Sequence, residues 1–323
     1  IGYNVGEVRV LARQSGGQWT TVHTVSGSYV RNGSRIRVVQ GDYGATASIH
    51  VNDNFRILAV SIRMGADYSQ SDRKNLVEMY LSAGDSTTWS LSQSIVVPNF
   101  TEPWTIGPAV IQSYVKSIVI SESLGTSGEI YMALGVSSTD YQVLLYKDSD
   151  PSDPEVSEWK LQATWMYGNV SNPDSRIDSF PSILITPNRV IVGLYNVKSS
   201  AGAPTCAYIK IYSLLTLEIV QEIDPKPCSP YLKLAGNSRD LFIAGDYSNN
   251  VVHVYRSKLI EGEVRYVQED SLKDENADAK VDSNIHFGYN VYVSQSDDIF
   301  VYAPRDSLLG QYDGSLLRYH STP

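Results

Sequence analysis

Short segments that alternate apolar and polar residues return along the chain and usually end in tyrosine. A period of two is typical of a β-strand with one buried face. The segments end at Tyr80, Tyr146, Tyr212, Tyr255 and Tyr319, and a related segment ends at Leu11 instead. Because successive end points lie 43 to 69 residues apart, the pattern predicts a protein built of repeated units.

Three further kinds of segment recur around most of these segments. A near-continuous apolar run precedes it, at residues 57–60, 130–133, 190–193, 241–244 and 299–302. A segment that often carries an aromatic residue and a glutamine follows it, at residues 19–22, 89–93, 159–162, 219–221 and 266–268. Another segment lies just before each apolar run, at residues 45–51, 115–120, 182–186, 231–235 and 289–294. A complete unit is therefore predicted to have four strands, and the apolar runs are predicted to form strands that are covered on both faces.

Repetition of such small sheets limits the possible folds. A four-stranded sheet of this size cannot bury both of its faces alone, so neighbouring sheets must stack. Radial stacking gives the β-propeller. We therefore expect an all-β fold, a β-propeller of four-stranded antiparallel blades. Small residues at Ala133, Gly193, Ala244 and Ala303 predict a crowded place for the apolar strand, which we assign to an inner position.

The number of blades follows from the number of predicted strands. The predicted blades cover residues 1–26 (in part), 43–96, 106–165, 177–223, 230–270 and 283–319. Four of them have four strands, the last has three, and the N-terminal one has two. Since the incomplete first and last blades do not combine into one, we expect six or seven blades rather than five. We also expect one propeller domain from a longer protein, with an incomplete N-terminal part.

Charge and hydropathy exclude several partners. The 323 residues include 26 Lys and Arg against 35 Asp and Glu, which gives a net charge of −9. Such a chain offers no broad basic surface for a phosphate backbone, so nucleic acid is not expected as a partner. No apolar run approaches the roughly 20 residues of a membrane helix, and the first residues lack the pattern of a signal peptide. We expect no membrane segment in this chain.

The last repeat resembles a known family. The run from His286 to Val291, the run from Asp298 to Arg305, and Gly310 followed by Gly314 to Tyr319 resemble, in this order, the FG-GAP repeat of integrin α-subunit propellers. The residues from Tyr43 to Ala45 begin a weaker copy. The resemblance implies an extracellular or surface-displayed interaction module that binds a protein or glycan through loops on one propeller face.

The same resemblance raises the question of calcium. FG-GAP propellers often hold calcium in the hairpin between the first two strands of a blade, where several carboxylate or amide oxygens surround the ion. The corresponding turns here are residues 52–54, 125–128, 186–188, 237–240 and 296–298. They are short and poor in carboxylates, so they predict ordinary hairpin turns. We expect no cofactor and disfavour calcium.

The two cysteines, Cys206 and Cys228, predict a disulfide. One lies just before the tyrosine strand of its blade and the other just after the next strand, which places both at one edge of an antiparallel sheet. A bridge would close a loop of about 23 residues, contribute about 3 kcal/mol in the chain-entropy model, and require an oxidising compartment. Two unrelated buried thiols are the alternative.

Three sequences of the form Asn-X-Ser/Thr predict possible N-glycosylation at Asn32, Asn99 and Asn169. All three lie between predicted strands, where a glycan could project. About three such matches are expected by chance in a chain of this composition, so only their position favours an extracellular protein.

No catalytic constellation is recognisable, and we expect no enzyme. The chain has no phosphate-binding glycine loop, no nucleophile elbow and no histidine pair at helical metal spacing. Asp297 and Asp298 are adjacent, so on a strand they would point to opposite faces rather than share a site. The run from Ser82 to Trp89 resembles, imperfectly, the Asp-box turn of sialidase propellers. Arg35, Arg37, Arg56 and Arg63 fall in one blade, but three of them alternate with apolar residues as on a solvated strand face.

The sequence therefore favours a non-catalytic module for adhesion or assembly. Two alternatives remain. One is a structural subunit of a filament, coat or surface array, in which copies of the chain contact one another. The other is a sialidase-like or other glycan-processing enzyme.

Overall fold

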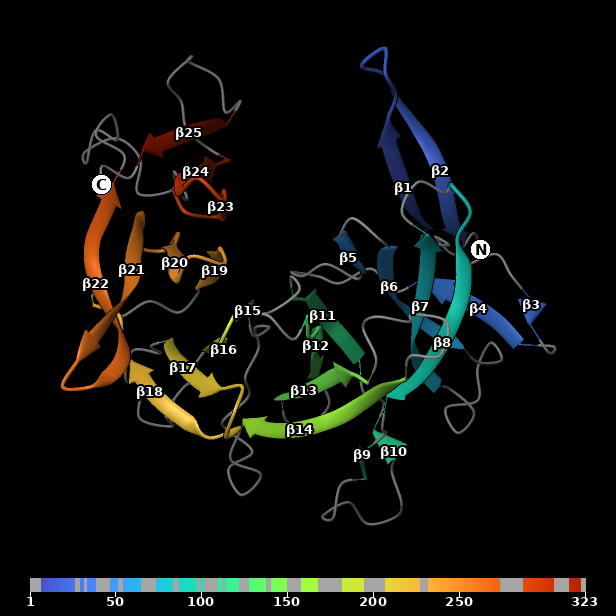
Figure 1. The fold of residues 1–323 in the computed structure, drawn as a ribbon, viewed down its shortest axis with the longest axis horizontal. Helices are drawn as coiled ribbons and strands as arrows, with labels where there is room; N and C mark the ends of the chain where they lie inside the picture. The colour runs from blue at the N-terminus through green and yellow to red at the C-terminus, as the bar shows by residue number, and fades with distance from the viewer. Residues whose placement is uncertain are drawn as a thin grey trace. The chain divides into compact units, whose positions relative to one another are not determined.

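The computed structural model of the chain is all-β, and its blades are those of a β-propeller. It describes residues 7–26, 30–31, 34–38, 47–51, 55–64, 74–83, 87–97, 100–101, 110–111, 114–121, 128–137, 141–149, 158–167, 182–194, 207–226, 232–273, 287–304 and 314–320. The chain divides into two compact units, residues 1–170 and residues 171–323. Each unit is a set of small antiparallel sheets (Figure 1).

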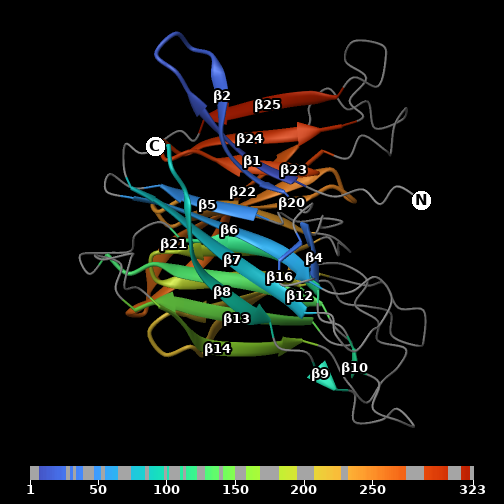
Figure 2. The ribbon, with the colours of Figure 1, turned by 90° about the vertical axis from the view of Figure 1, so that its right-hand side faces the viewer.

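The first unit contains two main sheets and two hairpins (Figure 2). One main sheet has the order β3-β4-β6-β7-β8, with β5 also paired to β6, and the other has the order β11-β12-β13-β14. The hairpins are β1-β2 and β9-β10. The strands are β1 (Glu7–Arg13), β2 (Trp19–Ser26), β3 (Val30–Arg31), β4 (Ser34–Val38), β5 (Ala47–Val51), β6 (Phe55–Met64), β7 (Lys74–Ala83), β8 (Ser90–Val97), β9 (Phe100–Thr101), β10 (Val110–Ile111), β11 (Tyr114–Ile120), β12 (Tyr131–Ser137), β13 (Tyr141–Asp148) and β14 (Trp159–Tyr167).

The second unit contains three sheets whose strands follow in chain order: β15-β16-β17-β18, β19-β20-β21-β22 and β23-β24-β25. The strands are β15 (Ser182–Thr186), β16 (Arg189–Leu194), β17 (Tyr208–Ser213), β18 (Ile219–Ile223), β19 (Lys233–Gly236), β20 (Leu241–Asp246), β21 (Val251–Ile260), β22 (Glu263–Lys273), β23 (Asn290–Val293), β24 (Asp298–Ala303) and β25 (Ser315–His320). The third sheet has three strands among the described residues.

The predicted strands are confirmed, and the apolar runs form the inner strands β6, β12, β16, β20 and β24, each of which pairs with a strand on both sides. At Gly193 a Cβ atom would lie 3.3 Å from the Leu234 side chain of the next sheet, which explains the small residue there. The short strands β3, β4, β9 and β10 were not predicted. The number of blades and the single domain remain predictions.

The recurring tyrosine marks a β-bulge. In four sheets the register between the third and fourth strands shifts directly before this tyrosine, at Tyr80, Tyr146, Tyr212 and Tyr255. The β1-β2 hairpin has the same shift before Leu11. Since a bulge bends one strand and increases its twist, the repeat specifies where the outer strand of each sheet bends. The hairpin therefore corresponds to the third and fourth strands of a blade.

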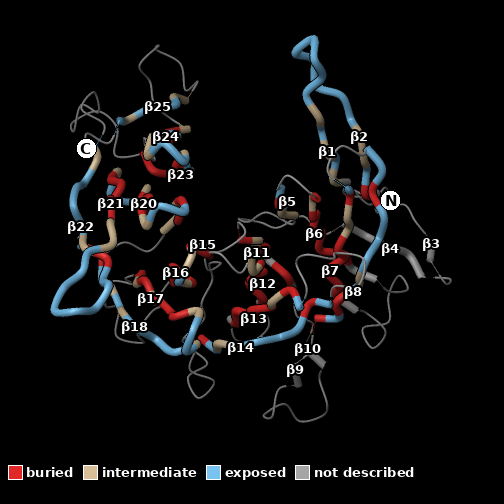
Figure 3. The backbone as a smooth tube through the Cα atoms, viewed as in Figure 1, coloured by how far each residue is buried: buried red, intermediate tan, exposed pale blue. Residues whose placement is uncertain are grey.

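Sheets within each unit stack face to face through dry apolar layers. In the first unit, one layer joins the β5-β8 sheet to β11-β14 and includes Ile57, Met79, Met132 and Leu144. The opposite face of β6 packs against the β1-β2 hairpin, with Val25 in the layer. Figure 3 shows buried residues concentrated in the middle strands and exposed residues in the outer strands.

The second unit repeats this arrangement twice. Ile191, Ile211 and Phe242 lie in the layer between β15-β18 and β19-β22. Ile243 and Val301 lie in the layer between β19-β22 and β23-β25. Because adjacent residues of a strand point to opposite faces, Phe242 and Ile243 serve different layers. This double burial is the reason for the continuous apolar runs.

Polar side chains connect the stacked sheets at their edges. At the first strands, Ser48 Oγ accepts a hydrogen bond from the Ile120 amide and Ser182 Oγ accepts one from Leu234, at 3.2 and 2.8 Å. At the fourth strands, Gln93 Oε1 accepts from the Trp159 amide at 3.0 Å. Gln221 accepts from the Tyr266 amide and donates to the Tyr266 carbonyl, both at 2.8 Å. The repeated glutamine and aromatic residue thus form a clasp between consecutive sheets.

Among the described residues, no helix has the length and apolar character to cross a membrane.

The Gln221 clasp should contribute measurably to stability. Gln221→Ala removes two hydrogen bonds and leaves backbone groups of the buried Tyr266 without partners, so we expect a loss of about 1–3 kcal/mol in the free energy of unfolding. The control is Gln162→Ala, because Gln162 is exposed and donates only to Lys160 of its own strand. Urea denaturation of both variants makes the comparison, and equal stabilities would contradict the clasp.

Candidate functional site

The candidate site lies at one end of the second unit, where several turns meet. The turn from Asn237 to Asp240 joins β19 to β20, and the turn from Ser294 to Asp297 joins β23 to β24. Asp240 and Asp297 have φ values of 59° and 64°, a conformation that Asp and Asn tolerate better than most residues. Side chains of the two turns contact each other, since Ser238 Oγ donates to Gln295 Oε1 at 2.8 Å.

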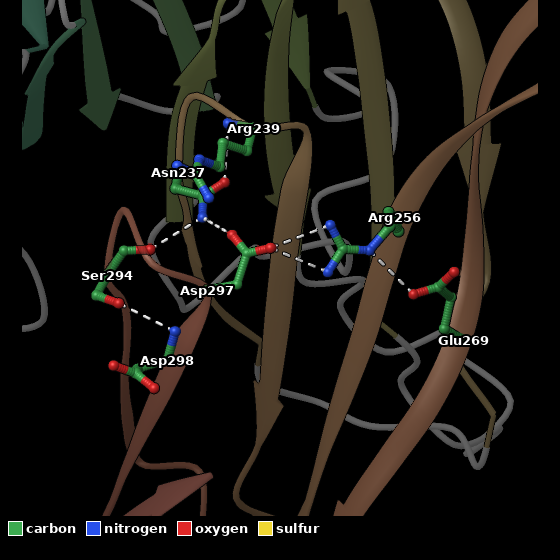
Figure 4. A network of polar contacts seen from close by, with 7 residues as sticks. All are labelled: Asn237, Arg239, Arg256, Glu269, Ser294, Asp297 and Asp298. Atoms are coloured by element: carbon green, nitrogen blue, oxygen red, sulfur yellow. Dashed lines mark hydrogen bonds and ion pairs between the residues drawn. The ribbon is translucent and has the colours of Figure 1, made fainter. Parts of the chain in front are cut away.

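A network centred on Arg256 holds these turns together (Figure 4). Both terminal nitrogens of Arg256 lie 3.2 Å from Asp297 Oδ2, and its Nε lies 3.2 Å from Glu269 Oε2. The Asn237 amide donates to Asp297 Oδ1 at 2.7 Å and to the Ser294 carbonyl at 2.9 Å. Arg256 therefore connects β21 and β22 to the adjacent sheet through charge-assisted hydrogen bonds.

The two adjacent aspartates have separate partners, as the sequence predicts. Asp298 interacts with Arg318 at 2.8 Å and with His320 at 2.7 Å, whereas Asp297 interacts with Arg256. The hydrogen bond from Arg318 lowers the pKa of the Asp298 carboxyl. These two carboxylates are therefore engaged in separate ion pairs.

A β-ribbon projects from this network. β20 pairs with β21 only as far as Arg256, but β21 and β22 continue as a two-stranded ribbon from Ser257 to Tyr266. Glu261 and Gly262 turn the ribbon with φ values of 51° and 83°, which is typical of a tight two-residue hairpin. The Arg256 network lies at the base of the ribbon and fixes its direction (Figures 1 and 4).

The two faces of the ribbon differ in polarity. Leu259 and Val264 are paired directly opposite each other and are 74% and 48% exposed. The other face carries Lys258 and Arg265, which pair with Glu269 and Glu263 at 3.0 and 2.8 Å. Near the turn the same face also carries Ile260, which is 37% exposed. The hydrogen bond from Lys258 lowers the pKa of the Glu269 carboxyl. The charged face is thus neutralised within the ribbon, and the apolar face remains open.

A further exposed apolar side chain lies at the same end of the neighbouring sheet. Leu215, in the turn between β17 and β18, is 91% exposed. This turn and the ribbon turn both join the third strand of a sheet to the fourth, and in consecutive blades such turns emerge on the same side. Tyr266 belongs to the ribbon face of Leu259 and Val264 and packs in the layer shared with β15-β18. The apolar face of the ribbon therefore points toward the side of Leu215.

In the first unit, polar groups are buried between the β1-β2 hairpin and β6-β8. The His23 ring stacks on Trp89 and tilts against Tyr80, with ring centroids 5.8 and 5.3 Å apart. Tyr80 donates its hydroxyl hydrogen bond to the buried carboxylate of Glu78. Burial lowers the pKa of His23. This cluster fixes the hairpin on its neighbour and offers no open site.

Most sequence-predicted site residues fall outside the described residues. This holds for Cys206 and Cys228 and for Asn32, Asn99 and Asn169, so the disulfide and the glycosylation sites remain predictions. The turns at residues 52–54 and 125–127 also lie outside. Of the four arginines, Arg37 and Arg63 are directly opposite each other in β4 and β6.

The ribbon and the Arg256 network were missed by the sequence interpretation. The segment from Val254 to Ile260 does not alternate regularly between apolar and polar residues, so the predicted strand ended at Tyr255. Within the described part of the chain, no group of three potential metal-ligating side chains is clustered.

Similar folds occur among solved structures. No protein-family model matches the chain, and no curated protein is significantly similar to it. The chain resembles BBS1N from a complex with ARL6DN (TM-score 0.42, 10% identity, 83% of this chain and 78% of that one). It also resembles the Cps50 (Swd1) β-propeller domain of Myceliophteria thermophila, with a TM-score of 0.40, 10% identity, and coverage of 90% of this chain and 90% of that one. A third similar structure is Trypanosoma rangeli sialidase, with a TM-score of 0.41, 13% identity, and coverage of 94% of this chain and 47% of that one. Similarities this weak say nothing about the activity or the partners of this chain.

Replacing Arg256 should destabilise the end of the second unit at which the turns meet. Arg256→Met leaves Asp297, which is 18% exposed, without its charged partner, so we expect a loss of about 1–3 kcal/mol in the free energy of unfolding. The control is Lys226→Met, since Lys226 pairs with Asp224 on the open surface and such pairs contribute little. Urea denaturation compares the variants, and equal losses would argue against the network.

The His23 cluster should make the first unit sensitive to acid. The pKa of His23 is lowered from the ordinary 6.5, so the unfolded chain binds more protons than the folded one. The free energy of unfolding should therefore fall as the pH drops below about 6.5. Glu78 and Tyr80 are the titratable groups that face it. Thermal unfolding at pH 7.5 and 5.5 should show the loss. His23→Phe should reduce this loss, and an undiminished loss in that variant would contradict the prediction.

Proposed function

We propose that this chain is a non-catalytic interaction module that binds a partner protein through the apolar face of the β21-β22 ribbon. The main observation in support is that Leu259 and Val264 are exposed on one face of the ribbon, whereas the charges of Lys258 and Arg265 on the opposite face are neutralised by ion pairs. Exposed apolar patches with polar surroundings are typical of protein interaction sites. Leu215 extends the apolar surface on the adjacent blade.

The composition of the ribbon favours a protein over a glycan. Its open face is aliphatic, whereas recognition of a polar ligand requires hydrogen-bonding groups placed to fix the orientation of that ligand. The charged groups near the ribbon are already paired: Lys258 and Arg256 with Glu269, and Arg265 with Glu263. The rigid two-residue turn lowers the entropy cost of binding, because the ribbon needs little ordering.

The resemblance to FG-GAP propellers supports an extracellular location and an interaction role. We infer an extracellular or cell-surface location and a role in adhesion or assembly, with a disulfide between Cys206 and Cys228. The resemblance to the integrin α head supports binding through turns at one end of the blades, which is where the ribbon lies.

Photo-crosslinking in natural material tests the proposal. A benzoylphenylalanine at position 259 should capture a specific partner, and the same group at position 161, on the exposed side of β14, is the control. With the purified partner, Leu259→Asp should weaken binding at least about tenfold, as expected for a central apolar contact. Lys258→Ala should change it little. Equal capture from both positions, or turnover of a fluorogenic glycoside panel by the unaltered chain, would contradict the proposal.

A further inference from the structure

The two edges of the β21-β22 ribbon carry main-chain groups whose direction is fixed by the turn. The turn has two residues, so Ile260 and Glu263 on either side of it form a hydrogen-bonded pair across the ribbon. In an antiparallel pair the next residues, Leu259 and Val264, point their N–H and C=O groups away from the partner strand. Each edge of the ribbon therefore has one outward-directed residue close to the turn.

Two contacts at the base of the ribbon agree with this alternation. Ser257 donates its N–H outward to the Asp240 carbonyl at 3.0 Å. Tyr266, two residues after Val264, has both main-chain groups bonded outward to the Gln221 side chain at 2.8 Å. Because the direction of the main-chain groups alternates along a strand, Val264 points to the same edge as Tyr266.

The Gln221 side chain shows which kind of group this edge receives. Its carboxamide accepts from the N–H and donates to the C=O of Tyr266, which are the two bonds that a residue of an added strand would make. Since β22 is the last strand of its sheet, Gln221 takes the place of a fifth strand there. Among the described residues, no backbone group outside the ribbon is bonded to Val264, and a Cβ atom at Gly262 would have no atom within 4 Å.

Aliphatic side chains border the edge at Val264 on both sides. On the ribbon, Val264 and Leu259 are 48% and 74% exposed. On the neighbouring sheet, Ile219 precedes Gln221 in β18 and is 45% exposed, and Leu215 in the turn before it is 91% exposed. β18 and β22 belong to consecutive sheets of the second unit and share its dry layer, so their arrangement is fixed within that unit.

We propose that the ribbon binds its partner as an extended polypeptide segment, whose main chain pairs with Val264 as the Gln221 carboxamide pairs with Tyr266. In such strand addition the main-chain bonds provide affinity and alternate side chains provide specificity. Aliphatic side chains of the segment contact Leu259 and Leu215 beside the edge. The inference rests on the proposed function and names the class of its partner. A helix or a folded surface would use the apolar side chains alone and leave the Val264 N–H unpaired.

A selected peptide serves as the probe. A phage-displayed library of linear twelve-residue peptides is selected on the unaltered chain and depleted on Leu259→Asp. The enriched peptide is then N-methylated at one amide at a time. Methylation of the amide that pairs with Val264 should weaken binding at least about tenfold. Methylation of its two neighbours should change binding little, because successive amides of a strand point to opposite edges. Side-chain contact alone would not produce this alternation.

A pair of variants tests the same bond from the side of the chain. Val264→Pro removes the outward N–H, and Val264→Ala, the matched control, keeps it. Proline is tolerated on an edge strand where the N–H faces outward, and circular dichroism with the thermal midpoint verifies the fold. Val264→Pro should bind the peptide at least about tenfold more weakly than Val264→Ala. If Val264→Pro does not fold, the N-methylated peptides decide the question.

Failure of this inference is distinguishable from failure of the proposed function. The extended segment is overturned if no peptide is enriched, if methylation has equal effects at all amides, or if folded Val264→Pro and Val264→Ala bind equally. In each of these cases the proposed function still stands when Leu259→Asp weakens binding of the protein that is crosslinked at position 259. Both proposals fall when Leu259→Asp has no effect on that protein.

Discussion

Dry contact between neighbouring sheets is the interaction on which this structure depends. The middle strands have side chains on both faces that are almost completely buried, such as Ile57 and Leu58 in β6 and Phe242 and Ile243 in β20. A four-stranded sheet cannot achieve this alone, because each face needs a partner surface. Among the described residues, Ser48, Ser182, Gln93 and Gln221 form polar cross-links at the edges of the sheets, where they reach the backbone of the next sheet.

The charged side chains at the turns of the second unit have a structural role, which differs from the role proposed for the exposed apolar side chains. Arg256, Asp297 and Glu269 are held by one another at the base of the ribbon, so their charge serves to fix the turns. A partially buried ion pair mainly specifies geometry, because desolvation offsets much of its attraction. The surface proposed for recognition is instead apolar, with Leu259 and Val264 exposed on the ribbon.

The strands could be predicted because their signals are local. A period of two, a continuous apolar run and a recurring tyrosine each depend on neighbouring residues alone, and all three reflect burial in a pleated strand. The glutamine and the aromatic residue were also visible as a pattern, but their purpose was not. Gln221 and Tyr266 are 45 residues apart, and no local rule pairs them. The ribbon was missed because the regular alternation ends near Tyr255, whereas β21 continues to Ile260.

The sequence by itself determined the all-β class, the four strands of a unit, and the separation of Asp297 from Asp298, since each follows from periodicity along one strand. Only the tertiary structure decided which sheet faces are covered. Leu11 and Tyr255 hold the same place in their repeats, yet one is 51% exposed and the other 1%. Exposure depends on whether a neighbouring sheet is present, and that neighbour is distant in the chain.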